Sequence, residues 1–272
     1  MEQETQRLIA RWPLVLPLAV PTLAGVIYLW MAGAPGSFVL INSAALAVGS
    51  GLIATLRLPG SSRTRLVIAG ALLCLLAMPM LLGPSVDGIE RWVSLGGFTL
   101  HTGFLAAPLL VRIAASEQRT GTWILLVAIV LAFSQPDFAT CLALSLGALA
   151  AAICKRQGAM FAVGVLGLAA SLGASFAVSL PPQPFVERVL PKLWAASPLA
   201  AGALGLALLS GAAALCLSQQ MPKTQRWAVL GTMLGFLTAA ALSDYPYPLI
   251  GYGAASILGF AISLLTPASK GD

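Results

Sequence analysis

The sequence predicts an all-α fold, a polytopic membrane protein with about ten transmembrane helices and both termini in the cytoplasm. Only 9% of the 272 residues are charged, whereas 58% are apolar. A typical soluble domain is about 25% charged. Because apolar stretches recur along the whole chain, we expect residues 1–272 to form a single transmembrane domain.

Ten apolar segments are the candidate spans, since about 20 apolar residues cross the hydrocarbon core of a bilayer. They are residues 13–33, 38–57, 66–84, 103–117, 121–135, 138–154, 158–180, 196–218, 227–243 and 253–267. Only Gln135-Pro136-Asp137 separates the fifth segment from the sixth. These two segments could therefore also form one interrupted helix, which would change the parity of the count.

The basic residues predict the orientation, because Lys and Arg accumulate in cytoplasmic loops. With ten spans and an inner N-terminus, twelve of the 15 basic residues fall inside and three fall outside. The three outer residues are Arg91, Arg188 and Lys192. Both termini are therefore predicted to be cytoplasmic. Arg112, near the inner end of the fourth span, is expected either to reach the cytoplasm with its long side chain or to have a function.

Four outer segments gather the polar residues, including Asp87, Glu90, Asp137, Glu187 and Asp244. The segments are residues 85–103, 134–140, 180–194 and 244–253. The Gly-Gly pair of the first predicts a turn after which the chain returns toward the membrane. In the second, Pro136 breaks the helix beside an acid. The fourth is predicted to be a broken helix rich in Tyr and Pro.

Three of these segments resemble signature regions of the SEDS family (shape, elongation, division and sporulation proteins, the RodA, FtsW and SpoVE group). In the family's Asn-Gly-Ala-Arg-Arg-Trp-Ile…Leu-Gly-Gly-Phe loop the matching residues are Gly88, Arg91, Trp92, Leu95, Gly96 and Phe98. In its Gln-Pro-Asp-Leu-Gly-Thr motif they are Gln135, Pro136, Asp137 and Thr140. In its Pro-Leu-Pro-Phe-Ile-Ser-Tyr-Gly-Gly-Ser-Ser motif they are Pro246, Pro248, Ile250, Tyr252, Gly253 and Ser256. The resemblance spans residues 66–265 of a short and divergent chain.

The resemblance implies a membrane glycosyltransferase of the bacterial cytoplasmic membrane with its functional face outside. Such an enzyme polymerises a polyprenyl-diphosphate-linked sugar, lipid II, into peptidoglycan. The implied partner is a single-span penicillin-binding protein or another envelope protein. We expect no cofactor and no metal site, because the four cysteines lie in apolar stretches without a CxxC pair; a divalent cation is left open.

Sugar transfer from a diphosphate requires a general base for the acceptor hydroxyl and a cation for the leaving group. Arg91 is the candidate cation, and Trp92 could stack on a sugar or seat the loop at the membrane interface. Glu90, Gln135 and Tyr252 complete the predicted substrate-binding set.

The candidate bases are Glu187 and Asp137. Asp137 could instead cap the following span. Glu187 could instead pair with Arg188 or Lys192 on a solvated loop.

The chain also departs from the family. The family's catalytic Asp lies in the outer loop between spans 7 and 8, where this chain has Leu190-Pro191-Lys192 and no acid after it. The Glu and Lys that follow the family's Trp loop fall on Phe104 and Ala107. Three hypotheses therefore stay open: a divergent glycosyltransferase, a non-catalytic relative that binds a lipid-linked sugar or a partner, and a lipid-linked sugar flippase or transporter.

Overall fold

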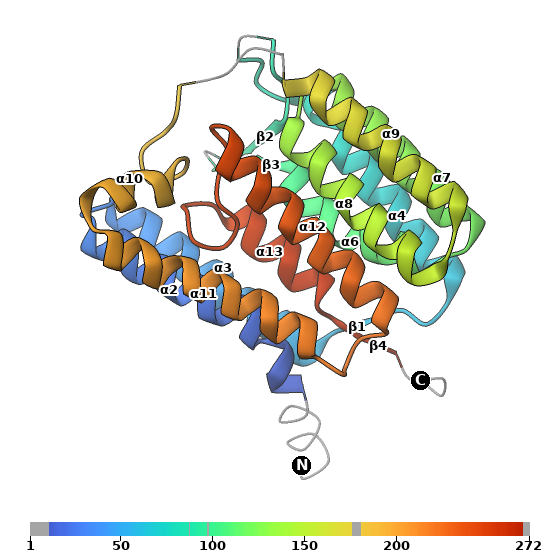
Figure 1. The fold of residues 1–272 in the computed structure, drawn as a ribbon, viewed down its shortest axis with the longest axis horizontal. Helices are drawn as coiled ribbons and strands as arrows, with labels where there is room; N and C mark the ends of the chain where they lie inside the picture. The colour runs from blue at the N-terminus through green and yellow to red at the C-terminus, as the bar shows by residue number, and fades with distance from the viewer. Residues whose placement is uncertain (1–10, 87, 97, 176–180, 269–272) are drawn as a thin grey trace.

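Each of the ten predicted apolar segments contains a helix in the computed structural model, which describes residues 11–86, 88–96, 98–175 and 181–268 (Figure 1). Residues 176–180 of the seventh segment lie outside the described residues. Within the described ranges, five helices are long and apolar enough to cross a membrane. The helices that lie in the ten apolar segments are α2 (Leu16–Met31), α3 (Gly36–Thr55), α4 (Ser62–Ala77) with its extension α5 (Pro79–Leu82), α6 (Thr102–Ser116), α7 (Arg119–Ser134), α8 (Phe138–Lys155), α9 (Gly158–Ser175), α11 (Pro198–Leu217), α12 (Lys223–Leu242) and α13 (Ala254–Ser263). A 3₁₀ helix, η1 (Trp12–Leu14), precedes them, and the short helix α10 (Val189–Ala196) precedes α11.

The break between α7 and α8 is complete, so the alternative of one interrupted helix is wrong. Helix α7 ends at Ser134 and α8 begins at Phe138, and the two helices pack against each other. The carboxylate of Asp137 accepts a hydrogen bond from the backbone N–H of Thr140 at 3.1 Å, which caps α8. The expected capping role of Asp137 is thereby confirmed.

Helices α6, α8, α12 and α13 form the centre of the molecule (Figure 1). The pair α2 and α3 packs with α11 on one side, and α4, α7 and α9 cover the other side. Small residues allow the central helices to approach closely. A Cβ atom on Gly231 of α12 would lie 2.5 Å from the carbonyl oxygen of Leu146 in α8, so no larger residue fits there.

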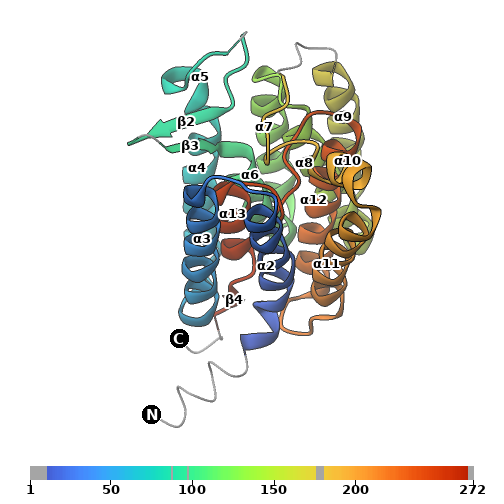
Figure 2. The same ribbon diagram turned by 90° about the vertical axis from the view of Figure 1, so that its left-hand side faces the viewer.

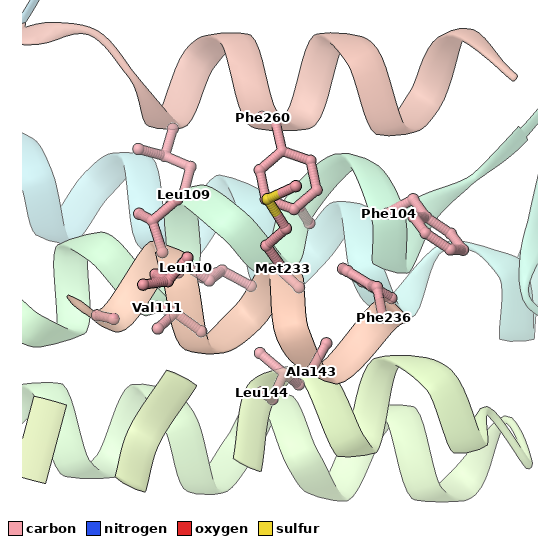
Figure 3. Packing of buried hydrophobic residues seen from close by; sticks show 14 of the residues in the cluster. Phe104, Leu109, Leu110, Val111, Ala143, Leu144, Met233, Phe236 and Phe260 are labelled. Atoms are coloured by element: carbon pink, nitrogen blue, oxygen red, sulfur yellow. The ribbon is translucent and has the colours of Figure 1, made fainter. Parts of the chain in front are cut away.

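Aromatic rings fill the middle of this core. The rings of Phe104 in α6 and Phe236 in α12 stack with centroids 4.1 Å apart, and Phe260 of α13 meets Phe236 edge to face at 6.5 Å. Figure 3 shows these rings beside Met233. Phe104 stands where the SEDS resemblance would place the family's Glu. At this position the chain has a buried aromatic ring in an apolar stack.

Two pairs of short strands complete the fold. Strands β2 (Trp92–Leu95) and β3 (Phe98–His101) form an antiparallel hairpin in which Trp92 pairs with His101. The sequence predicted a turn here but not the strand pairing. Strand β1 (Arg57–Leu58) pairs in parallel with β4 (Thr266–Pro267). Strand β4 and the beginning of α2 lie at one end of the bundle, opposite the β2–β3 hairpin (Figure 2).

Of the two alternatives considered for Arg112, the one in which its long side chain reaches out to the cytoplasm is wrong. Its side chain is fully buried, its Nη1 donates to the carbonyl oxygen of Ser263 at 2.6 Å, and its Nε donates to Oε1 of Gln225 at 3.0 Å. Because Ser263 is the last residue of α13, Arg112 supplies a positive charge to the carboxyl end of that helix. The residue thus ties α6, α12 and α13 together.

Candidate functional site

A cavity of about 290 Å³ opens where the β2–β3 hairpin meets two loops, residues 181–188 and 244–253. Most of its wall is apolar or aromatic, and a few polar groups converge on it, as is typical of small-molecule sites. The polar and aromatic residues that line it are Arg91, Trp92, Thr99, His101, Phe104, Gln183, Glu187, Tyr245, Tyr247, Tyr252 and Ser256. Four of the predicted site residues are therefore brought together: Arg91, Trp92, Glu187 and Tyr252.

Arg91 is the cation of the cavity, and it is 5% exposed. Its guanidinium carbon lies 4.6 Å from the ring centroid of Trp92 and 4.5 Å from that of Tyr245. Its Nη1 donates a hydrogen bond to the hydroxyl oxygen of Tyr245. Within the described part of the chain, no carboxylate forms an ion pair with Arg91, and its Nε has no hydrogen-bond partner. Cation–π contacts contribute about 0.5–2 kcal/mol each, which is less than the several kcal/mol that burying a cation costs.

Glu187 is the carboxylate of the cavity and is partly buried. Its Oε2 accepts a hydrogen bond from the backbone N–H of Gln183 at 2.7 Å. Burial raises the pKa of Glu187 above its usual value, although the Gln183 N–H and the positive charge of Arg91 act in the opposite direction. A raised pKa suits a carboxylate that exchanges protons near neutral pH.

The turn that presents Glu187 has an unusual backbone. Phe185 and Arg188, on either side of Glu187, adopt positive φ angles of 63° and 56°, which are costly for residues other than glycine. Contacts hold the turn in place: the N–H of Tyr252 donates to the Phe185 carbonyl at 2.8 Å. Arg188 forms an exposed ion pair with Asp244 at 3.2 Å. Glu187 does not form the surface ion pair with Arg188 or Lys192 that was considered from the sequence.

Helix α3 fixes the loop 244–253 from the other side. The amide of Asn42, which is fully buried, donates to the Gly251 carbonyl at 3.0 Å and accepts from the Gly253 N–H at 3.1 Å. One helical turn earlier, the ring of Phe38 stacks on Tyr252 with centroids 3.7 Å apart. Tyr252 therefore contributes to the cavity wall with one face of its ring occupied by protein.

Asp137 lies behind the cavity wall rather than in it. Its side chain is fully buried, and its Oδ2 lies 3.6 Å from Nε2 of His101. The Nδ1 of His101 accepts from the Phe104 N–H at 3.4 Å and so caps α6. Burial lowers the pKa of His101 to about 4, more than the Asp137 charge raises it. His101 is therefore neutral near pH 7, and the pair serves to cap α6 and α8.

The remaining two predicted site residues do not line the cavity. Gln135 is buried, and its Nε2 donates to the carbonyl oxygen of Leu76, which joins the α7–α8 turn to the end of α4. Glu90 is half-buried and forms no hydrogen bond or ion pair with the described residues, so it does not neutralise Arg91. No group of three or more His, Cys, Asp or Glu side chains within the described ranges could hold a metal ion.

Two residues that position the site, Tyr245 and Asn42, were not identified from the sequence. Tyr245 was noted only as part of a Tyr- and Pro-rich segment. Asn42 lies in an apolar span and is the only asparagine of the chain. A polar side chain within a span commonly marks a function or an interhelical contact, and that signal could have identified Asn42. Nothing in the local sequence connects Tyr245 with Arg91.

No protein-family model matches the sequence, and no curated protein is significantly similar to it. The fold, however, is that of solved structures. The crystal structure of the rod shape determining protein RodA of Thermus thermophilus has a TM-score of 0.63 and 23% identity, with 93% of this chain and 95% of that chain covered. A mutant of the same protein gives the same values.

A chain from the structure described as "Structural coordination of polymerization and crosslinking by a peptidoglycan synthase complex" has a TM-score of 0.59 and 21% identity. The match covers 93% of this chain and 96% of that chain. This chain therefore has a RodA-like, multi-pass membrane fold, which confirms the fold expected from the SEDS resemblance.

Proposed function

We propose that this protein transfers sugars from a polyprenyl-diphosphate carrier to a growing glycan at the outer surface of a bacterial cytoplasmic membrane. One observation carries the proposal: Arg91 and Glu187 line the same aromatic cavity, and no ion pair joins them. The cavity lies at the hairpin end of the bundle, which the distribution of Lys and Arg assigns to the outside. Both termini are then cytoplasmic.

In the proposed reaction, Glu187 accepts the proton of an acceptor sugar hydroxyl. The hydroxyl oxygen attacks the anomeric carbon of the donor sugar and forms the new glycosidic bond. The bond between that carbon and the diphosphate oxygen breaks, and the diphosphate leaves with the electron pair. Arg91 stabilises the negative charge of the leaving group, for which a guanidinium fork is well suited. Trp92 and Tyr252 contribute aromatic surface for the sugar rings.

We assign the base to Glu187 rather than Asp137. Asp137 is fully buried, caps α8 and does not line the cavity. Glu187 lies in the loop where the SEDS resemblance would place the family's catalytic Asp, although upstream of that position. The proposed partner is a single-span penicillin-binding protein or another envelope protein. A complex of a structurally similar chain supports this partner class.

The second candidate function is that of a non-catalytic relative that binds a lipid-linked sugar. The absent acid after Lys192 and the apolar stack at Phe104 favour this alternative. A flippase or transporter has less support, because the buried charge of Arg112 is used to cap α13.

The test is polymerisation of fluorescent lipid II by the purified protein, with and without a partner penicillin-binding protein. We expect glycan product from the wild type and a loss of about 10²–10⁴-fold in Glu187→Gln. Asp137→Asn is the matched control, and it should retain activity per folded molecule. Binding of lipid II without any product would favour the non-catalytic alternative. Product from Glu187→Gln at the wild-type rate would contradict the assignment of the base.

A further inference from the structure

Tyr245 holds the guanidinium of Arg91 in two ways. Its hydroxyl oxygen accepts the hydrogen bond from Nη1 of Arg91, and its ring lies under the guanidinium with 4.5 Å between the guanidinium carbon and the ring centroid. Trp92 contacts the guanidinium at a similar distance. Tyr245 is itself 6% exposed, so its own position is fixed by packing. The plane of the guanidinium is therefore set before any ligand arrives.

This arrangement holds the cation without neutralising it. A phenol and two aromatic faces attract a guanidinium, but they supply no formal negative charge. Within the described residues Arg91 has no ion-pair partner, and its buried Nε has no hydrogen-bond acceptor. Because an unpaired buried cation is unfavourable, the cavity favours a ligand that carries an anionic group to Arg91.

We propose that Tyr245 is a positioning residue that orients Arg91 toward the diphosphate of a polyprenyl-linked ligand. The inference rests on the proposed function and extends it to a residue that none of the three sequence motifs includes. A guanidinium held in one plane can donate two parallel hydrogen bonds to phosphate oxygens without first losing rotational freedom. Tyr245 contributes to affinity for the charged head group, not for the lipid tail.

Tyr247 provides a matched control within the same loop. It also lines the cavity and is also 6% exposed. In the described part of the chain, however, its hydroxyl makes no hydrogen bond and its ring makes no cation contact. Tyr247→Phe therefore removes a hydroxyl at equal burial without affecting Arg91.

The experiment measures the binding of undecaprenyl diphosphate and of uncharged undecaprenol to the protein in lipid nanodiscs. We expect Tyr245→Phe to weaken diphosphate binding about tenfold and to leave undecaprenol binding unchanged. Tyr247→Phe should weaken diphosphate binding less than Tyr245→Phe does, because the Tyr247 hydroxyl makes no contact with Arg91. In an Arg91→Met background, Tyr245→Phe should have no further effect, because its action passes through Arg91.

Three outcomes would overturn the inference. Equal losses in Tyr245→Phe and Tyr247→Phe would show that only general packing matters, and the proposed function would stand. Losses that add in the double variant would show that Tyr245 acts independently of Arg91. If the wild type fails to bind undecaprenyl diphosphate, the inference and the proposed function are both wrong.

Discussion

Two of the buried arginines in the described part of this membrane protein, Arg91 and Arg112, are held in opposite ways. Arg112, at the end of the bundle away from the hairpin, donates to the last carbonyl of α13 and to an amide oxygen of α12. Arg91, at the hairpin end, lines the cavity and contacts the aromatic rings of Trp92 and Tyr245. Both acceptors of Arg112 belong to the helices that it joins, whereas the side chain of Arg91 has one acceptor, the hydroxyl of Tyr245, which orients the guanidinium. Each guanidinium keeps one buried nitrogen without a partner, Nη2 in Arg112 and Nε in Arg91, but only Arg91 lines the cavity. The comparison indicates that Arg112 stabilises the structure, whereas Arg91 is oriented for a ligand.

The largest difference in ligand affinity and in stability should appear between the variants in which each of these arginines is replaced by methionine. Arg91→Met should reduce binding of undecaprenyl diphosphate at least about 100-fold, since a charge-assisted bidentate contact is lost. Its melting temperature should stay unchanged or rise, because an unpaired buried charge is replaced by an apolar side chain. Binding isotherms and thermal melts in nanodiscs measure both quantities. A large drop in the melting temperature would mean that Arg91 is structural.

Arg112→Met should show the reverse behaviour. The carbonyl of Ser263 and the amide of Gln225 would lose their donor inside the protein, which we expect to cost about 2–3 kcal/mol. The ligand affinity of the folded fraction should equal that of the wild type. The measurement is chemical unfolding in parallel with the binding assay. A loss of affinity without a loss of stability would contradict the assigned role.

Asn42→Leu tests the support of the cavity loop. The substitution leaves the Gly251 carbonyl and the Gly253 N–H without partners, and we expect a loss of about 2 kcal/mol of stability. Asn42→Gln keeps an amide but moves it by one methylene group, so its ligand affinity should lie between those of Asn42→Leu and the wild type. Equal affinity in all three proteins would show that α3 does not position this loop.

His101 should make the hairpin end sensitive to acid. Its pKa is lowered to about 4 by burial, so the unfolded chain binds a proton first as the pH falls below about 6.5. Stability is therefore lost with falling pH, by about 1 kcal/mol between pH 7 and pH 5.5 from this residue. The melting temperature of His101→Gln should change less between pH 7 and pH 5.5 than that of the wild type. A wild-type profile that matches the variant would contradict the assigned neutral state.

The smallest change in stability is expected from a substitution in the turn of residues 185–188, which has two positive φ angles. Arg188→Gly removes the cost of a positive φ angle, about 1 kcal/mol, and loses an exposed ion pair with Asp244 that contributes about 0–1 kcal/mol. The net change in stability should be slightly favourable or absent. Chemical unfolding checks this. A clear loss would show that the ion pair orders the loop more strongly than its exposure suggests.

The helices could be predicted from the sequence because the length and polarity of a span are local properties. The ten apolar segments, the cap at Asp137 and the break at Gln135–Asp137 all depend on neighbouring residues. The hairpin was missed because its two strands have only four residues each, too few to show a period of two.

The cavity could be predicted only in part. Motif positions identified Arg91, Trp92, Glu187 and Tyr252, which line it, but also Asp137, Gln135 and Glu90, which do not. The decisive contacts join residues far apart in the chain. Arg91 and Tyr245 are 154 positions apart, and Asn42 and Gly251 are 209 positions apart. Such pairs depend on the tertiary packing of the helices and leave no local pattern.

The most direct test of the central claim is a cryo-electron microscopy structure of the protein with undecaprenyl diphosphate. The proposed function predicts diphosphate density in the cavity between the hairpin and the loop 244–253, within hydrogen-bonding distance of the guanidinium of Arg91. The isoprenoid chain should run from there between the helices. Diphosphate density elsewhere on the protein, with the Arg91 cavity empty, would contradict it.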